Sequence, residues 1–330
     1  MSGFNGSFLR PTKNRGSFVP MYWGDGSDGV LTAGDTYHAG EDYDKYSGFC
    51  IKQFASINWV PGSLETLTVD EPCRGLILFV KGDVNIGANA TISMAKMGSV
   101  LPANPPELLD ICGASTHMRH IVDVLKTLKG GEGGDGGGAI ATGTPGTPGT
   151  GGLGRICQGG FAGGGAGAAY TGCIGGDGGS IEFTEVIGYQ GYEDSGHGIW
   201  GGGGNYNGQS GRRGIGGRPF GAGGAGASYT TYDGGDGEHS GGVILIIAKG
   251  SITIAGALDV TGGNGGDAST YNTADGGGGG GGAGGGVIAV FARGFIDTAS
   301  ATKTLTGGSG GAGYQSGTAG GSGTYYEEQI

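Results

Sequence analysis

The sequence has little charge, little proline and no long apolar run. Only 14% of its 330 residues are charged, and no segment approaches the roughly 18 consecutive apolar residues of a membrane-spanning helix. The first residues lack the apolar core of a secretory signal. These absences predict a protein that is made in a cytoplasm without export and does not insert into a membrane.

Cysteine is also scarce, and the charge balance is acidic. The net charge of −11 argues against nucleic acid and anionic membrane surfaces as partners. An odd number of cysteines at irregular spacing, without a C-x-x-C pair, predicts neither a zinc site nor a disulfide framework. We expect no cofactor, and buried reduced thiols at Cys50, Cys73, Cys112, Cys157 and Cys173.

Catalytic motifs are missing as well. The sequence contains no G-x-S-x-G elbow and no H-E-x-x-H, and its matches to a phosphate-binding loop are by-products of glycine content. We therefore expect a protein that is not an enzyme. Polysaccharide cleavage is an alternative. It needs two carboxylates about 5 to 10 Å apart in a groove. Candidates for such a pair are Glu182, Glu185, Glu193 and Asp194.

Glycine is the residue that the chain has in excess. Only 15 of the 87 glycines precede residue 130, which leaves 72 in the last 201 residues. Collagen-like G-x-y order is confined to Gly143–Gly149, and a disordered linker does not account for the buried strands described next. Dense backbone hydrogen bonding would offset the entropy lost in ordering so much glycine. Parallel extended helices of the polyglycine II type offer it.

A repeated unit organises the chain. Val243–Ala248 is a continuous apolar run typical of a strand buried on both faces, and a glycine corner and an alternating strand follow it. A near copy begins at Val287 with a period of 44, from Gly250 to Gly294, and a more distant copy begins at Leu76. An isolated strand pair is marginally stable in water, so such units are expected to stack.

The predicted fold class is mainly β, with repeat-built β-structure followed by extended polyglycine II-type helices and one short α-helix at about residues 115–129. The predicted divisions are an N-terminal arm (1–20), a β-structured head with the first repeat and the helix (21–129), and a glycine-rich repeat domain (130–330). Ser115 or Thr116 would cap the helix, which has one apolar stripe. That stripe is Met118, Ile121, Val122, Leu125 and Leu128. An insertion between repeats is usually a lid or a docking element, and this one is expected to dock on a neighbouring subunit.

Two features of the sequence resemble metal-binding patterns. His117 and His120 form an H-x-x-H pair on the predicted helix, but no carboxylate or cysteine stands beside them on the same face. The Tyr22–Val30 cluster contains the acidic spacing of a calcium loop but not its terminal glutamate, which favours an Asx-turn cap. We expect no metal site.

The order of motifs resembles glycine-rich bacteriophage tail-fibre and adhesin proteins. The resemblance is carried by an aromatic-GDGSDG opening (Tyr22–Gly29), a P-G-S-L-x-T-L-T-V pair (Pro61–Val69) and R-G-L-I-L-F-V-K-G-D-V-N-I (Arg74–Ile86), followed by glycine repeats. It implies a virion protein that contacts the host. The glycine-rich half is similar to the T-even-type adhesins, which implies stacked polyglycine II helices with receptor-reading loops, whereas the β-structured head departs from them.

A second duplication points to the candidate site. Gly164–Gly178 and Gly223–Gly237 align at an offset of 59, so their glycines are expected to form scaffold and the segments between them to vary. Aromatic and polar loops on a rigid frame are a common binding surface. Aromatics that only plug the glycine lattice are the open alternative. The receptor-binding candidates are Tyr189, Tyr192, Trp200, Tyr206, Arg212, Arg213, Tyr229, Tyr232 and Tyr271.

The expected function is that of a noncatalytic virion protein, a tail-fibre or receptor-binding adhesin that recognises a host glycan or outer-membrane protein. The chain is expected to form a homotrimer or to dock on a trimeric fibre. Its other expected partners are virion tail proteins and the host receptor. A purely structural decoration of the head or baseplate is the main alternative. A polysaccharide depolymerase and an ice-binding protein are the remaining ones.

Overall fold

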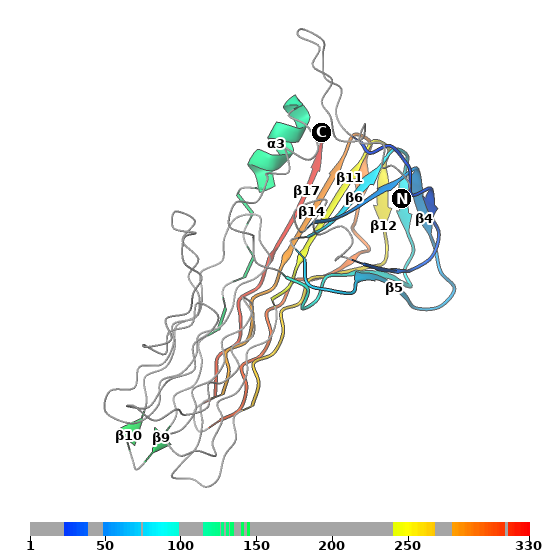
Figure 1. Cartoon of the computed structure of the whole chain (residues 1–330). Coiled ribbons are helices and arrows are strands. Elements are labelled where there is room, and N and C mark those ends of the chain that lie inside the picture. Colours follow the sequence, from blue (N-terminus) through cyan, green and yellow to red (C-terminus); the bar gives the residue numbers. More distant parts are fainter. Residues whose placement is uncertain are drawn as a thin grey trace, which may run out of the picture.

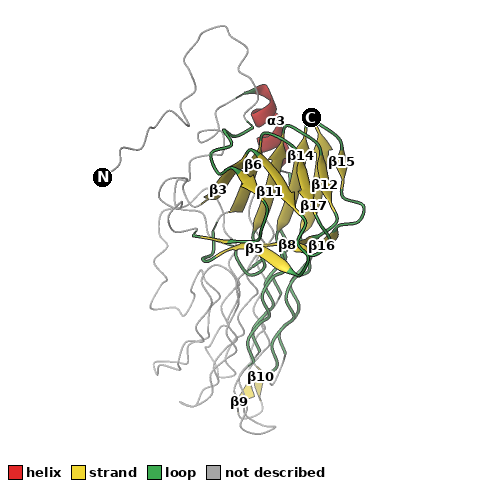
Figure 2. Ribbon diagram, turned by 90° about the vertical axis from the view of Figure 1, so that its right-hand side faces the viewer, coloured by secondary structure: helices red, strands yellow, loops and turns green. Residues whose placement is uncertain are grey.

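Successive passes of the chain lay short strands beside one another and build three parallel five-stranded sheets (Figures 1 and 2). Each pass contributes strands to the three sheets in turn, so the chain forms a β-solenoid whose passes we call rungs. The fold is mainly β, as predicted. This computed structural model describes residues 23–38, 49–73, 75–98, 115–125, 127–128, 130–131, 133–134, 140–141, 144–145, 240–267, 279–313 and 316–330.

Sheet 1 contains the repeated apolar strands and confirms the predicted repeat. Val243 lies beside Val287, 44 residues away, and Ile244 lies beside Leu76 of the distant copy. Stacking of the units is therefore direct strand pairing in register. In spatial order the strands are β3 (Phe49–Phe54), β6 (Gly75–Val80), β11 (Val243–Ala248), β14 (Val287–Ala292) and β17 (Thr324–Gln329).

Sheets 2 and 3 are made of the shorter strands that follow the corners of each rung. Sheet 2 contains β1 (Val30–Leu31), β4 (Ser56–Trp59), β7 (Val84–Ile86), β12 (Ile252–Ile254) and β15 (Ile296–Asp297). Sheet 3 contains β2 (Thr36–Tyr37), β5 (Glu65–Val69), β8 (Ala90–Ser93), β13 (Ala257–Asp259) and β16 (Thr302–Thr304). A separate antiparallel pair consists of β9 (Ile140–Ala141) and β10 (Thr144–Pro145).

Two further copies of the sheet 1 strand escape the sequence pattern. β3 pairs with β6 over six residues, although Lys52 and Gln53 interrupt its apolar run and Ala55 stands where other copies have a glycine corner. β17 pairs with β14 over six residues, although its sequence is Thr-Tyr-Tyr-Glu-Glu-Gln. β3 and β17 are the two outermost strands of sheet 1. An outermost strand has a neighbouring strand on one edge only, and it therefore tolerates polar residues.

Columns of apolar side chains fill the interior of the solenoid. Leu67, Ile92 and Leu258 form one column, because their strands pair in register, and all three are fully buried. Burial of one such side chain stabilises the fold by about 1.5 to 3 kcal/mol. Cys50 and Cys73 are also buried, as predicted. The other three cysteines lie outside the described residues.

Helix α3 (Thr116–Leu125) covers the outer face of sheet 1 (Figure 1). Sheet 1 is buried on both sides for this reason, as the continuous apolar strands predict. The stripe packs on sheet 1 of its own chain, and docking of the insertion on a neighbouring subunit stays a prediction. The predicted stripe is confirmed and consists of the buried residues Met118, Ile121, Val122, Leu125 and Leu128.

Both ends of α3 have local explanations. Ser115 is the N-cap, because its Oγ accepts a hydrogen bond from the Met118 N–H at 3.2 Å. The predicted C-terminal end at residue 129 is wrong, since the α-helix ends at Leu125. Thr127 N–H bonds to Val124 O at 2.8 Å, three residues back, so the last turn tightens and the α-helical pattern stops.

Four glycine-rich segments leave and rejoin the solenoid between its rungs: residues 260–267, 279–286, 305–313 and 316–323. They lie side by side and run away from the sheets (Figure 1). Backbone N–H···O bonds of 2.7 to 3.0 Å join them, and the donors in each segment recur every third residue. The donor–acceptor pairs are Gly262–Thr306, Gly265–Ser309, Gly280–Gly266, Ala283–Gly263, Gly286–Val260, Gly282–Thr318, Gly285–Gly321, Gly308–Ala283, Gly311–Gly280, Gly317–Gly311, Gly320–Gly308 and Gly323–Leu305.

Segment 279–286 lies at the centre of this glycine bundle. It is buried throughout and is bonded to the other three segments, and it also accepts hydrogen bonds from Gly131 and Gly134, both at 2.7 Å. A period of three residues is that of an extended threefold helix. Some neighbouring segments are parallel, as 260–267 and 305–313 are, but others are antiparallel, as 260–267 and 279–286 are, although the sequence predicts a parallel arrangement. The polyglycine II helix type stays a prediction.

Close backbone approach explains why these positions are glycine. A Cβ added at Gly282 would lie 2.1 Å from Gly308 O, and one added at Gly285 would lie 2.0 Å from Leu305 O. These distances are far below van der Waals contact and involve backbone atoms, which cannot rotate away. Any side chain at these positions would therefore separate the segments and break their hydrogen bonds.

The glycine-rich half contributes strands to the same sheets as the head. β11, β14 and β17 belong to the proposed domain 130–330, whereas β3 and β6 belong to the proposed head 21–129, and all five form sheet 1. The boundary at residue 129 therefore divides a chain whose two sides share three sheets. In the structure, the separation is between solenoid rungs and the glycine segments that connect them.

The GDGSDG opening caps the first complete rung. Asp25 Oδ1 accepts a hydrogen bond from the Ser27 N–H at 2.8 Å, which is the predicted Asx turn. Asp28 N–H donates to Gln53 O at 3.0 Å, so the loop covers the outer edge of β3. Gly26 has a φ of 75°, a conformation that favours glycine in this turn.

We predict that Gly282→Ala destabilises the glycine bundle by about 1 to 3 kcal/mol, because its methyl group would overlap backbone atoms. Thermal unfolding and amide hydrogen exchange of residues 279–286 measure the effect. Gly62→Ala is the matched control, since a Cβ at Gly62 meets nothing within 4 Å. Equal unfolding temperatures and exchange rates for the two variants would contradict the close packing described above.

Candidate functional site

The nine predicted receptor-binding residues lie outside the described residues. Eight of them fall within residues 146–239, and Tyr271 falls within residues 268–278. The carboxylates considered for catalysis, Glu182 to Asp194, also fall within 146–239. These assignments stay predictions, and the structure bears on them only through the scaffold that flanks them.

The described scaffold places the ends of one candidate loop. Gly286 bonds to Val260 O beside the solenoid, and Gly280 bonds to Gly266 O further along the same pair of segments. Segments 260–267 and 279–286 are thus antiparallel, and residues 267 and 279, which flank residues 268–278, lie at the end remote from the sheets. Segments 305–313 and 316–323 are joined at the same end, where Gly317 bonds to Gly311 O at 2.9 Å. Chain reversals therefore gather at the distal end of the bundle.

Polar side chains follow the three-residue period on the exposed side of the bundle. Residues 261, 264 and 267 interrupt the glycines of one segment, as residues 306, 309 and 312 do in another. Asn264 Oδ1 accepts the Ser309 N–H at 2.9 Å, and Asp267 Oδ1 accepts the Ala312 N–H at 2.6 Å. These side chains satisfy backbone donors that face out of the glycine bundle, which is a structural use for non-glycine residues.

A polar cluster closes the C-terminal end of the solenoid. Glu327 and Lys303 continue interior columns that consist of apolar residues in the preceding rungs. Thr298 Oγ1 donates to Glu327 Oε2 at 2.6 Å, and the Tyr325 hydroxyl donates to the same oxygen. Lys303 Nζ lies 4.4 Å from the centre of the Tyr325 ring. The N-terminal end is closed in a similar way, by a lysine ammonium over a tyrosine ring, with Lys52 Nζ at 4.7 Å from the ring of Tyr37.

The ionisation of this terminal cluster suits a cap better than acid–base catalysis. Burial and the hydrogen bond to Glu327 raise the pKa of Tyr325, so its hydroxyl keeps its proton. Burial also raises the pKa of Glu327, but the hydroxyl groups of Thr298 and Tyr325 lower it by more, so the carboxylate stays ionised. The pKa of Tyr325 is raised and that of Glu327 is lowered, so both move away from neutral pH. A general acid or base works best with a pKa near the operating pH.

A second polar contact ties α3 to the last strand. His120 Nε2 lies 2.9 and 3.0 Å from the two carboxylate oxygens of Glu328, and the Tyr326 hydroxyl donates to the same carboxylate at 2.9 Å. The partners are 208 residues apart in the sequence, which is why the predicted solvent-facing position of His120 could not reveal them. This contact joins the insertion that follows the second complete rung to the final strand.

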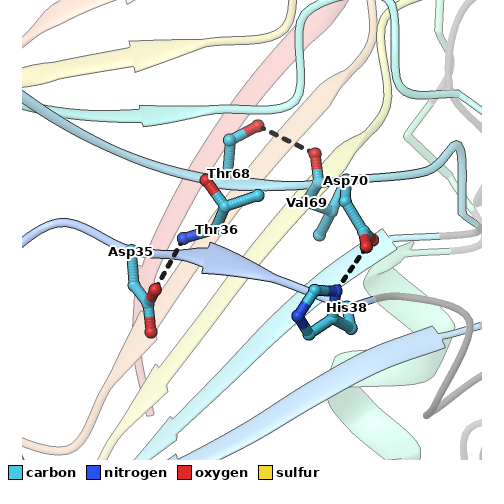
Figure 3. A network of polar contacts seen from close by, with 6 residues as sticks. All are labelled: Asp35, Thr36, His38, Thr68, Val69 and Asp70. Carbon is cyan, nitrogen blue, oxygen red and sulfur yellow. Dashed lines mark hydrogen bonds and ion pairs between the residues drawn. The ribbon is translucent and has the colours of Figure 1, made fainter.

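The edge of sheet 3 carries a third polar network (Figure 3). His38 Nδ1 lies 2.6 Å from Asp70 Oδ2, and Thr36 N–H donates to Asp35 Oδ1 at 2.8 Å. Thr68 N–H also donates to Asp35 O at 3.0 Å. The His38–Asp70 and Thr68–Asp35 contacts hold the two-residue strand β2 against β5. The network therefore closes this edge of sheet 3.

The outer face of sheet 3 is lined by short hydroxyl side chains. Pairing in register places Thr66, Thr91 and Thr302 in one column, with Ala257 between the last two. The neighbouring column contains Ser93, Asp259 and Thr304, and Asp259 Oδ1 already accepts a bond from the Thr261 hydroxyl at 2.6 Å. This face is polar and regular.

Among the described residues, no group of three or more His, Cys, Asp or Glu is placed to hold an ion. In that part of the chain no helix is long and apolar enough to cross a membrane. Comparison with family models, with curated proteins and with solved structures finds no match for this chain.

We predict that the contact made by Glu328 contributes stability that is lost in acid. Burial raises the pKa of Glu328, but the bonds from His120 and Tyr326 lower it by more, to below its ordinary value of 4.5. The contribution is fully present above that value and disappears as the pH falls through the lower folded-state pKa. Glu328→Gln is expected to lose about 0.2 to 1 kcal/mol at pH 6 and little at pH 3.

Chemical unfolding between pH 3 and pH 6 measures this difference. Glu71→Gln is the matched control, because Glu71 is an exposed carboxylate at the opposite end of the solenoid. A difference between the wild type and Glu328→Gln that does not change with pH would show that the carboxylate charge is not what holds α3 to β17.

Proposed function

We propose that this chain is a noncatalytic bacteriophage virion protein, a tail-fibre or receptor-binding adhesin, and that loops at the distal end of the glycine bundle recognise a host glycan or outer-membrane protein. The loops that carry the candidates Tyr189 to Tyr232 and Tyr271 would supply the contacts. Other virion proteins would be its partners, and the chain would act as a homotrimer or on a trimeric fibre.

The observation that carries this proposal is the position of the chain reversals. The described glycine segments turn back at the end remote from the solenoid, and each is held to its neighbours by a hydrogen bond at every third residue. Loops on such a scaffold lose little entropy on binding, because their ends are already fixed. Polyglycine II packing, the proposed form of these segments, would make the scaffold stiff along its length.

The terminal clusters support a noncatalytic role. Three acidic side chains in the described part of the chain, Glu65, Glu327 and Glu328, have lowered pKa values. Hydrogen bonds to backbone, tyrosine, threonine, tryptophan or histidine donors cause the lowering. Carboxylates held in this way act as structural acceptors rather than as proton donors at neutral pH.

A purely structural virion component is the second candidate. The observation that favours it is that the polar side chains of the described bundle are used internally, since Asn264 and Asp267 accept backbone N–H groups of the neighbouring segment. In that case the glycine bundle would stiffen a head or baseplate assembly, and the distal loops would only close it.

We predict that replacing residues 268–278 with a glycine–serine segment of equal length lowers binding to host cells at least about tenfold, because this removes Tyr271 and its neighbours from the distal end. Fluorescently labelled protein is titrated onto bacteria that the phage infects and onto a mutant of the same strain that resists adsorption. Thermal unfolding verifies that the scaffold is intact.

Leu64→Ser is the control, because Leu64 is 84% exposed and lies on the solenoid, away from the bundle. It should leave cell binding unchanged. If the unmodified protein neither binds susceptible cells nor competes with the phage for adsorption, the adhesin proposal fails. A virion reconstruction that places the chain away from any fibre tip would then support the structural candidate.

A further inference from the structure

We propose that a row of cationic side chains at one corner of the solenoid binds an acidic polysaccharide, one that carries uronate or phosphate groups along its chain. The row, called here the basic corner, consists of Lys81, Lys249 and Arg293. This inference rests on the proposed adhesin function, since it names a second class of contact with a cell surface.

The basic corner is built by the register of sheet 1. Each of its residues directly follows the last residue of a sheet 1 strand, in β6, β11 and β14 respectively. Lys249 N–H donates to Val80 O at 2.9 Å, and Arg293 N–H donates to Ala248 O at 3.0 Å, so the strand register continues through these positions. Successive rungs are about 4.8 Å apart, and the three exposed side chains therefore stand in one line.

Within the described part of the chain, no carboxylate forms an ion pair with the three cations of the basic corner. Lys81 Nζ reaches only a carbonyl oxygen, that of Asp25, at 3.4 Å. The nearby carboxylates have backbone partners: Asp83 Oδ1 accepts the Ser251 N–H at 2.8 Å, and Asp25 Oδ1 accepts an N–H of its own turn. Like charges on adjacent strands repel, and an anionic ligand would remove that repulsion. The row also stands out in a chain whose net charge is −11.

The surroundings of the basic corner suit a sugar chain. Gly82, Gly250 and Gly294 follow the three cations, and the next column consists of Asp83, Ser251 and Phe295. Asp83 Oδ1 lies over Gly250, and Ser251 Oγ lies over Gly294. Phe295 is 59% exposed, which is unusual for a phenylalanine and offers an apolar ring face beside Arg293. A ring face next to cations fits the apolar face and the anionic groups of an acidic sugar.

The basic corner and the glycine bundle lie at opposite ends of the sheet 1 strands. Segment 279–286 directly precedes β14 and segment 316–323 directly precedes β17, whereas Arg293 follows β14. Figure 1 shows β14 and β17 running from the bundle toward the opposite end of the solenoid. Binding at this corner is therefore spatially separate from residues 268–278. A variant in either surface is expected to leave the other intact.

A regular row of like charges favours a polyanion with repeated charges over a folded acidic protein. Acidic polysaccharides present their anionic groups at intervals along an extended chain, which can lie along the row. A folded partner would be expected to pair the cations individually with carboxylates. It would also bury the exposed phenylalanine within a larger apolar contact.

The experiment measures binding of the purified full-length chain to polygalacturonate, with neutral dextran as the uncharged comparison. The wild type should bind polygalacturonate, weaken as salt is raised, and not bind dextran. Lys249→Gln should weaken binding about two- to fivefold, and the double variant Lys249→Gln, Arg293→Gln about tenfold or more. Lys96→Gln is the control, because Lys96 is an exposed lysine where the chain passes from sheet 3 toward the bundle, and it should bind like the wild type.

Equal weakening by Lys96→Gln, or equal binding to dextran, would overturn the inference, because net charge or general stickiness would then account for the signal. Failure of the wild type to bind polygalacturonate and a phosphate-bearing polysaccharide would also overturn it. Pull-down of an acidic virion protein through the same three residues would then assign the row to a protein contact. Replacing residues 268–278 should not change these affinities, so the two proposals fail separately.

Discussion

Backbone hydrogen bonding between successive passes of the chain is the interaction on which the whole structure depends. The strands are two to six residues long, and such strands have no stability alone, because their N–H and C=O groups find partners only on the next rung. The glycine segments meet the same requirement with a bond at every third residue. Solenoid and bundle are therefore two solutions to one constraint, alternating along a single chain.

The distance between neighbouring backbones decides which residue types each part of the structure accepts. In the solenoid the three sheets leave room between them for columns of side chains. Aliphatic residues stack there, as Leu67, Ile92 and Leu258 do. In the bundle the backbones approach until no Cβ fits, and Gly282 and Gly285 are required. The stack must also end, and it does so where Lys303 and Glu327 replace apolar members of the interior columns.

Much of the local structure could be predicted, because its causes lie within a few residues. The period of 44, the strands buried on both faces, the apolar stripe of α3, its Ser115 cap and the Asx turn at Asp25 all follow from spacing and side-chain chemistry. The strand pattern at residues 49–57 predicts β3, but neither its place in the repeat nor the strand β17 could be found in this way, because edge strands carry polar residues that hide the repeat. Of the candidate site, only the scaffold on both sides of residues 268–278 is described, and the loop residues stay predictions.

By itself the sequence determined which units repeat, where glycine is obligatory and which helical face is apolar, since these depend on periodicity along the chain. Only the tertiary structure decided which distant residues meet. Lys81, Lys249 and Arg293 are three separate basic-glycine pairs in the sequence, and strand register makes them one row. His120 and Glu328 are 208 residues apart, and they meet because α3 covers the sheet that β17 completes. Register and packing bring them together, and neither is encoded at any single position.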